Sequence, residues 1–355
     1  MRTTPTRRFA AIAAVVTVAA LALTGCVAGE GAPASTPVAS TTPGAKLGAG
    51  GWSASTLNID YATYNPLSLI VKQEGYLEKA FDGKVTVNWV KSAGSAVANQ
   101  ALQAGAIDVG STAGSAALLA RSNHSPIKTI DVYAQPDWAA IIVPKGSPIT
   151  SVKDLAGKHI AAFKGTDPYF FLLQALQKFK VPLSSVTIDN LPHADGKAAL
   201  ENGSVDAWSG LDPLLTTSVL TAGSKNIYDN PSFNTYGFLN ATESFLQKSP
   251  DLAQAVVDAY EKARAFAQKN PDKVTQILAE AAGIDPSIAA ATLKRTDLGI
   301  DPVPGAVQTK VLKVVGPIFV ASGDVATQSQ IDDALKSLYD TRYAKRADPA
   351  ELPNQ

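Results

Sequence analysis

The sequence predicts an α/β protein of two similar lobes, followed by a tail of helices. From residue 57 onward, short runs rich in β-branched residues alternate with helical patterns, and one spaced pattern occurs twice. After residue 240 only helical patterns remain. The chain has 355 residues, 46% of them hydrophobic and 17% charged, which is enough for two packed lobes of ordinary size.

Residues 1–25 are interpreted as a signal peptide that ends before the chain's one cysteine. Arginines precede an apolar run over residues 9–23, which is short and alanine-rich for a membrane-spanning helix. Leu23-Thr24-Gly25-Cys26 closes the run and resembles the lipobox of bacterial lipoproteins, so we expect a lipid anchor at Cys26. Arg7-Arg8 also resembles part of a twin-arginine signal, but the rest of that motif is missing, and we expect the general secretory route.

Residues 26–55 are interpreted as the lipidated cysteine and a flexible tether. Nearly all of them are Gly, Ala, Ser, Thr or Pro, which bury too little apolar surface to offset the entropy of ordering. Lysine plus arginine equals aspartate plus glutamate at 31 each, so no net field favours nucleic acid or an anionic membrane surface. We therefore expect no nucleic-acid partner, and a membrane contact made through the lipid rather than through charge.

The two lobes are predicted from strands and helices in the same order. Strands are expected at 57–61, 85–90 and 107–109 in the first lobe, and at 159–163, 186–188 and 205–208 in the second. Leu102-x-x-Gly105-x-Ile107-Asp108 recurs as Leu200-x-x-Gly203-x-Val205-Asp206, with the spacing that a helix end, a glycine cap and a strand start require. One copy fits any such junction, whereas two copies in corresponding places favour a pair of like lobes.

The tail is predicted to be helical and to pack on the first lobe. Ser249 followed by Pro250 is typical of an N-cap and a first helical position, and this helix is expected to run to about residue 269. Further helices are expected over 272–282, 286–294, 304–322 and 330–338.

An ordered set of motifs resembles the solute-binding proteins of the nitrate, taurine and aliphatic-sulfonate ABC importers. The set comprises Ser147-Pro148-Ile149, Asp154-Leu155, Gly157-Lys158, Lys164-Gly165, Val205-Asp206-Ala207-Trp208 and Asp212-Pro213. The resemblance implies a type II periplasmic-binding-protein fold with a cleft between the lobes. Lobe 1 would comprise residues 56–141 and 238–345, and lobe 2 residues 142–237, with hinge strands near 141–143 and 237–239.

The resemblance also implies a function outside the cytoplasm. The expected role is to capture a small organic anion, an aliphatic sulfonate first, and to deliver it to an ABC permease and its ATPase as a monomer without a cofactor. A ligand sensor subunit is the alternative, and an enzyme on the same fold is the third hypothesis. Against catalysis, His124, His159 and His193 form no spaced metal pair, and each is expected in or beside a loop, where side chains are solvated.

Candidate binding residues follow from where ligands lie in open α/β sheets. They lie beyond the carboxyl ends of strands, where helix N-termini attract anions. The candidates are Tyr64, Asn65, Ser92, Gly94, Ser111, Thr112, Gln135, Gly165, Thr166, Asp167, Trp208 and Asp212. The sequence leaves open whether Ser111 and Thr112 bind solute or only cap a helix. It also leaves open whether Trp208 walls the ligand or fills the core, and whether Asp212 serves the ligand or holds a backbone loop.

Overall fold

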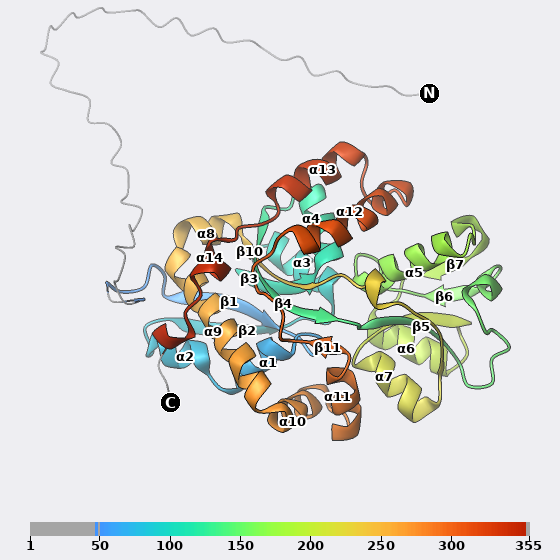
Figure 1. Ribbon diagram of the computed structural model, residues 1–355, viewed down its shortest axis with the longest axis horizontal. Helices are drawn as coiled ribbons and strands as arrows, with labels where there is room; N and C mark the ends of the chain where they lie inside the picture. The colour runs from blue at the N-terminus through green and yellow to red at the C-terminus, as the bar shows by residue number, and fades with distance from the viewer. Residues whose placement is uncertain (1–46, 49, 353–355) are drawn as a thin grey trace, which may run out of the picture. The chain divides into compact units, whose positions relative to one another are not determined.

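The computed structural model describes residues 47–352 apart from residue 49, and its two sheets define two lobes (Figure 1). The strand order is β11-β4-β10-β3-β1-β2 in lobe 1 and β7-β6-β8-β5-β9 in lobe 2. Cys26 and the predicted signal peptide lie outside the described residues. Among the residues described, no helix is both long enough and apolar enough to cross a membrane.

The two sheets share one plan. Sheet 1 contains β1 (Thr56–Tyr61), β2 (Thr86–Lys91), β3 (Val109–Ala113), β4 (Ile127–Pro136), β10 (Gly237–Thr242) and β11 (Thr296–Asp297). Sheet 2 contains β5 (Ala139–Val143), β6 (His159–Ala161), β7 (Thr187–Asp189), β8 (Ala207–Leu211) and β9 (Lys225–Asp229). In each sheet three neighbouring strands are parallel, and an antiparallel strand, β10 or β5, pairs with the third of them.

The repeated sequence pattern forms the same local structure in both lobes. Gly105 and Gly203 adopt positive φ angles of 67° and 78°, the left-handed conformation that favours glycine after a helix. Three residues later, the Asp108 carboxylate accepts a backbone N–H of β1 at 2.8 Å, and the Asp206 carboxylate accepts one of β6 at 2.9 Å. The pattern thus ties the third strand of each lobe to the first.

Helices cover both faces of each sheet. Lobe 1 contains α1 (Pro66–Gln73), α2 (Tyr76–Phe81), α3 (Ser95–Gln103) and α4 (Gly114–Ser122), and lobe 2 contains α5 (Asp167–Lys178), α6 (His193–Glu201) and α7 (Leu214–Thr217). In Figure 1, α1 lies on one face of sheet 1 and α3 and α4 on the other, while α5 lies opposite α6 and α7 in lobe 2. Five of these helices, α1, α3, α4, α5 and α6, each follow a parallel strand, so they begin beyond the carboxyl ends of the strands of their sheet.

The helical tail packs mainly on lobe 1, as predicted. It contains α8 (Glu243–Lys248), α9 (Pro250–Lys269), α10 (Pro271–Ala282), α11 (Pro286–Leu293), α12 (Ala306–Ala321), α13 (Gln328–Ser337) and α14 (Arg342–Arg346). Helix α9 buries a stripe at helical spacing, formed by Leu252, Val256, Tyr260, Ala263 and Ala267, and it contacts α1. Helices α12 and α13 contact α4. Two tail helices also reach lobe 2, because α12 contacts α5 and α11 contacts α7.

The chain crosses between the lobes in two short segments, residues 137–138 and 230–236. We expected hinge strands near 141–143 and 237–239. Strand β5 pairs along its length with β8 and β9, so residues 139–141 lie in lobe 2. A buried apolar run such as Ala139–Val143 suits either sheet, and the sequence does not say which sheet receives it.

The end of the expected tether is attached to lobe 1. The Trp52 ring packs edge-to-face on Phe81 with ring centroids 4.8 Å apart. The Ser53 backbone N–H donates to the Asp251 carboxylate at 2.8 Å. Since Asp251 lies in the first turn of α9, this contact also suits the positive end of that helix.

Candidate functional site

Two pairs of helix N-termini from opposite lobes meet where the lobes touch. At the first junction, Ser115 in the first turn of α4 donates to Asp167, the first residue of α5, at 2.6 Å. At the second junction, a Cβ added to Gly94, the N-cap of α3, would lie 3.2 Å from the ring of His193, the first residue of α6. Each helix start carries positive partial charge and unpaired N–H groups, so both junctions favour negative charge.

The α4/α5 junction contains the protein's own anion. The buried Asp167 carboxylate accepts the Ser115 hydroxyl at 2.6 Å, the Trp138 indole N–H at 2.8 Å, and the backbone N–H and hydroxyl of Thr235 at 2.8 and 2.7 Å. Burial raises the pKa of Asp167, while these hydrogen bonds oppose the rise. Asp167 therefore joins lobe 2 to lobe 1 and to both crossing segments, and its charge disfavours a second anion.

The α3/α6 junction contains a histidine in place of an anion. His193 is only 3% exposed, and neither ring nitrogen has a hydrogen-bond partner among the described residues. Its ring packs edge-on to Phe163 with centroids 5.5 Å apart, and burial lowers its pKa to about 3. Within the described part of the chain, no side chain caps the first turn of α3 or of α6. Buried polar groups are nearly always paired, so this junction has unused hydrogen-bonding capacity.

His193 corrects our expectation that each histidine is solvated in or beside a loop. Helix α6 starts at His193, with Pro192 as its N-cap. The helix start is buried because it meets α3 of the other lobe, and no local pattern encodes that contact. The role of His193 at the junction is therefore not predictable from the sequence around it.

The floor beside α3 is a polar cluster at the carboxyl ends of β1 and β3. The buried Asp60 carboxylate accepts the backbone N–H of Ser111 at 2.9 Å and its hydroxyl at 3.1 Å. The Tyr64 hydroxyl donates to the Ser111 carbonyl at 2.9 Å. Burial raises the pKa of Asp60 to about 7, although hydrogen bonds from Ser111 and Ser92 oppose the rise. The structure thus brings Tyr64, Ser92 and Ser111 together around Asp60, which is not one of the predicted site residues.

Asn65 and Thr112 have their polar groups engaged inside lobe 1. The Asn65 side-chain oxygen accepts the Ser68 N–H at 3.2 Å, which caps α1, and its amide donates to the Tyr260 hydroxyl at 3.1 Å. Thr112 lies within β3, where its hydroxyl donates to the Ala113 carbonyl at 2.9 Å.

Gly165 and Thr166 lie beside the α3 start, whereas Gln135 does not share this environment. A Cβ added to Gly165 would lie 3.6 Å from the Cβ of Ala96, which is in the first turn of α3. The Thr166 hydroxyl donates to the Phe163 carbonyl at 2.6 Å, which shapes the loop that carries Phe163. Gln135 is exposed on β4, where it pairs with β11.

Trp208 and Asp212 serve lobe 2 itself. Trp208 is fully buried, in a hydrophobic cluster with residues of β5 and β6. The Asp212 carboxylate accepts the Thr216 N–H at 2.9 Å and the Thr216 hydroxyl at 2.6 Å, and so holds the backbone that follows it. Arg295 donates to the same carboxylate at 3.1 Å.

Arg295 connects the tail of lobe 1 to lobe 2 beside the crossing segments. Its guanidinium lies 3.1 Å from a carboxylate oxygen of Asp212, 3.1 Å from one of Asp229 and 3.4 Å from one of Asp137. Burial raises the pKa of Asp137 to about 6, while Arg295 opposes the rise. One cation thus compensates three carboxylates that belong to lobe 2 and to the crossing.

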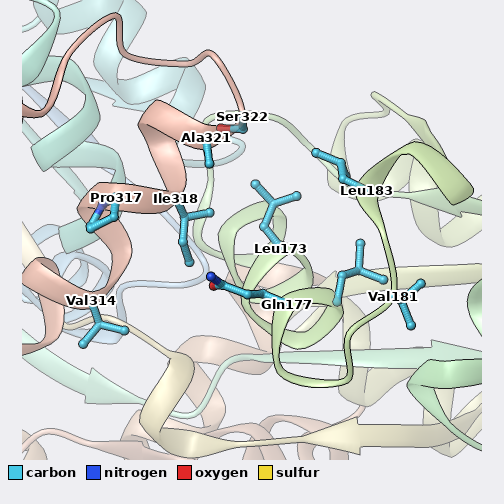
Figure 2. Close-up of a pocket in the computed structure, with 10 residues that line it drawn as sticks. Leu173, Gln177, Val181, Leu183, Val314, Pro317, Ile318, Ala321 and Ser322 are labelled. Carbon is cyan, nitrogen blue, oxygen red and sulfur yellow. The ribbon is translucent and has the colours of Figure 1, made fainter.

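A separate cavity of about 350 Å³ lies between α5 and α12, away from these junctions (Figure 2). It is lined by Leu173, Leu176, Gln177, Val181, Leu183, Val314, Pro317, Ile318, Ala321 and Ser322. The lining is mostly apolar and contains none of the predicted site residues. Its polar side chains, Gln177 and Ser322, provide no positive charge for an anion.

Replacing Asp60 with asparagine is expected to change how stability depends on pH. The folded-state pKa of Asp60 is about 7, above its ordinary value of 3.8, so the folded state binds this proton more tightly. Its contribution to stability is complete below about pH 4 and is lost as the pH rises through about 7. Relative to wild type, Asp60→Asn should therefore gain up to about 4 kcal/mol between pH 4 and pH 8. Urea unfolding at both pH values measures this difference, and an equal offset at both would contradict it.

A family model described as NMT1/THI5 like matches residues 68–274 of the chain. A protein of Escherichia coli (strain K12), named as an aliphatic sulfonates-binding protein, is 28% identical over 243 residues, which cover 68% of this chain and 76% of that protein. The solved structure of the alkanesulfonate-binding protein SsuA from Xanthomonas axonopodis pv. citri bound to MOPS is similar, with a TM-score of 0.71 and 23% identity. The match covers 79% of this chain and 98% of SsuA.

The likeness confirms the predicted periplasmic-binding-protein type of fold, which also occurs in an enzyme. The desulfurization enzyme DSZB is similar, with a TM-score of 0.60 and 15% identity over 82% of this chain and 98% of the enzyme. The fold alone therefore does not distinguish a binding protein from an enzyme, and the residues of the site must decide between these two functions.

Proposed function

We propose, from the fact that the chain belongs to the NMT1/THI5-like family, that it is the extracytoplasmic solute-binding component of an ABC importer. It captures a small organic anion, an aliphatic sulfonate first, and delivers it to the permease. The sulfonate-binding relatives support the solute class. The observation that carries the proposal is the α3/α6 junction, where two helix starts from opposite lobes meet around the buried His193. In the part of the chain that the structure describes, no side chain caps either start and neither nitrogen of His193 has a hydrogen-bond partner.

The anionic head of the solute binds between the first turns of α3 and α6. Gly94 lacks a side chain, so the backbone of α3 can approach the solute closely, and His193 provides a donor from lobe 2. Ser92 and Gly165 flank the same junction from lobes 1 and 2. Because the contacts come from both lobes, solute binding stabilises the arrangement in which the lobes touch.

The test is solute binding by the purified chain, measured by thermal shift and titration calorimetry. The panel contains ethanesulfonate, taurine, methyl sulfate, nitrate, ethylamine and glucose. Ethanesulfonate is expected to bind with a micromolar or lower Kd, and saturation at a hundredfold excess over Kd stabilises the fold by about 2.7 kcal/mol. Stabilisation by ethylamine or glucose alone would contradict the proposal. Turnover of any sulfonate, in place of stoichiometric binding, would favour the enzyme hypothesis.

We further propose that residues 1–25 are removed and that a lipid on Cys26 holds the protein at the outer face of the membrane. Leu23-Thr24-Gly25-Cys26 at the end of the apolar run supports this proposal. Two or three acyl chains anchor durably where one does not. Replacing Cys26 with serine should move the protein from the membrane fraction to the soluble fraction, and unchanged membrane association would contradict lipid anchoring.

A further inference from the structure

We infer that solute binding at the α3/α6 junction is coupled to the uptake of one proton by His193. The inference rests on the proposed function, because it concerns the same site. It adds a property that neither the fold nor the relatives imply, namely that affinity for the anion rises as the pH falls.

The hydrogen-bonding chemistry of the junction favours a doubly protonated ring once the solute is bound. Neutral imidazole has one donor and one acceptor nitrogen, and neither nitrogen of His193 has a partner among the described residues. A sulfonate offers acceptors only, and the first turns of α3 and α6 offer donors only. The acceptor nitrogen can pair with a helix N–H but not with the sulfonate, whereas a protonated ring presents two donors to the anion.

The charge balance of the junction changes in the same direction when an anion enters. Without solute, burial alone lowers the pKa of His193, and no charged neighbour contributes to the shift. An anion in contact with the ring stabilises the imidazolium and so raises the pKa of His193, because opposite charges at contact distance in a partly dry site attract strongly.

The charged groups around the His193 ring do not provide the negative charge that would stabilise its imidazolium, so this charge must come from the solute. Helix α3, which faces the ring, carries no titratable side chain, and neither do β8 and α7 behind α6. On α6 itself, Asp195 and Lys197 follow His193, and His159 on β6 is exposed. Lys164, next to Phe163, is also exposed. Asp60, in the polar cluster beside α3, has a pKa of about 7, so it is a competing proton acceptor.

The coupling has a definite sign and size. The bound state holds one more proton than the free state wherever the pH lies between the two pKa values of His193, so the affinity rises as the pH falls. We expect Kd for ethanesulfonate to fall about tenfold between pH 7.5 and pH 5.5. Ethanesulfonate is a strong acid and stays ionised throughout, so the proton cannot bind to the solute.

The experiment is calorimetric titration of ethanesulfonate at pH 6 in two sulfonate-free buffers of different ionisation enthalpy. The difference in heat gives the number of protons taken up. The chain is compared with His193→Gln and with His124→Asn, which removes an exposed histidine far from the junction and keeps a side chain that tolerates the positive φ at that position. Nitrogen NMR of the imidazole groups in the unmodified chain, with and without ethanesulfonate, reports the protonation of His193 directly.

Each outcome decides the inference. Proton uptake by the unmodified chain and by His124→Asn, lost in His193→Gln and accompanied by an imidazolium shift of the His193 nitrogens, supports it. Binding without proton uptake, or uptake retained in His193→Gln, overturns the inference and leaves the proposed function standing. If no anion of the panel binds at any pH, the proposed function itself fails. The NMR result keeps the test decisive if His193→Gln does not fold.

Discussion

Replacing Arg295 with methionine is expected to lower the free energy of unfolding by about 3–5 kcal/mol. Arg295 is the cation that compensates the carboxylates of Asp137, Asp212 and Asp229, and its side chain is only 25% exposed. Methionine keeps much of the apolar stem but leaves three carboxylates close together without a positive charge. Two of these carboxylates belong to lobe 2, so the loss also weakens the contact of the tail with that lobe. Urea unfolding at pH 7 measures the change.

Two further variants separate this explanation from a general effect of removing an arginine. Arg342 pairs with Asp340 on the surface with a 75% exposed side chain, so Arg342→Met is expected to cost less than about 1 kcal/mol. Adding Asp229→Asn to Arg295→Met should recover part of the lost stability, because it removes one of the uncompensated charges. Equal losses for the two arginine variants would show that the charge cluster does not stabilise the fold.

The fold could be predicted largely because its two lobes repeat a local pattern. Residues 102–108 and 200–206 each contain a helix end, a glycine with positive φ and an aspartate that binds the first strand. Because these features lie within seven residues, the sequence alone predicts the same local structure in both lobes. The crossings could not be placed, because β5 is an apolar run that either sheet could accept. The contacts of α11 and α12 with lobe 2 depend on how the folded lobes meet. Hydrophobic periodicity along these helices does not predict which lobe they contact.

The candidate site could be predicted only in part, for the same reason. Helix starts are visible in the sequence, and the candidates Gly94 and Asp167 lie at the starts of α3 and α5, where the lobes meet. Which junction already contains an anion depends on Asp167 meeting Ser115, a contact 52 residues apart in the chain. Asp60 reads as one polar position in an alternating strand, and its burial against Ser111 becomes visible only when β1 and β3 are adjacent.

Replacing Gly94 with valine is expected to weaken ethanesulfonate binding at least about a hundredfold, because Gly94 is the point where α3 meets lobe 2. The Cβ alone would lie 3.2 Å from two atoms of the His193 ring, and the branched methyl groups reach further into the junction. They would displace the ring, cover the first-turn N–H groups of α3 and hold the lobes apart. Loss of several hydrogen bonds to a charged group accounts for an effect of this size. Titration calorimetry of the variant measures the affinity.

Gly105→Val is the matched control, because Gly105 lies just beyond the other end of the same helix. Both glycines have positive φ, 151° for Gly94 and 67° for Gly105, so valine strains the backbone at either position and should cost stability in both variants. Among the residues that the structure describes, however, a Cβ on Gly105 meets no atom within 4 Å beyond its two neighbours in the chain, so the α3/α6 junction stays intact. Gly105→Val should therefore lose stability and keep its affinity. If the two variants bind ethanesulfonate equally well, the solute does not bind at the start of α3, and the anion must be sought elsewhere between the lobes.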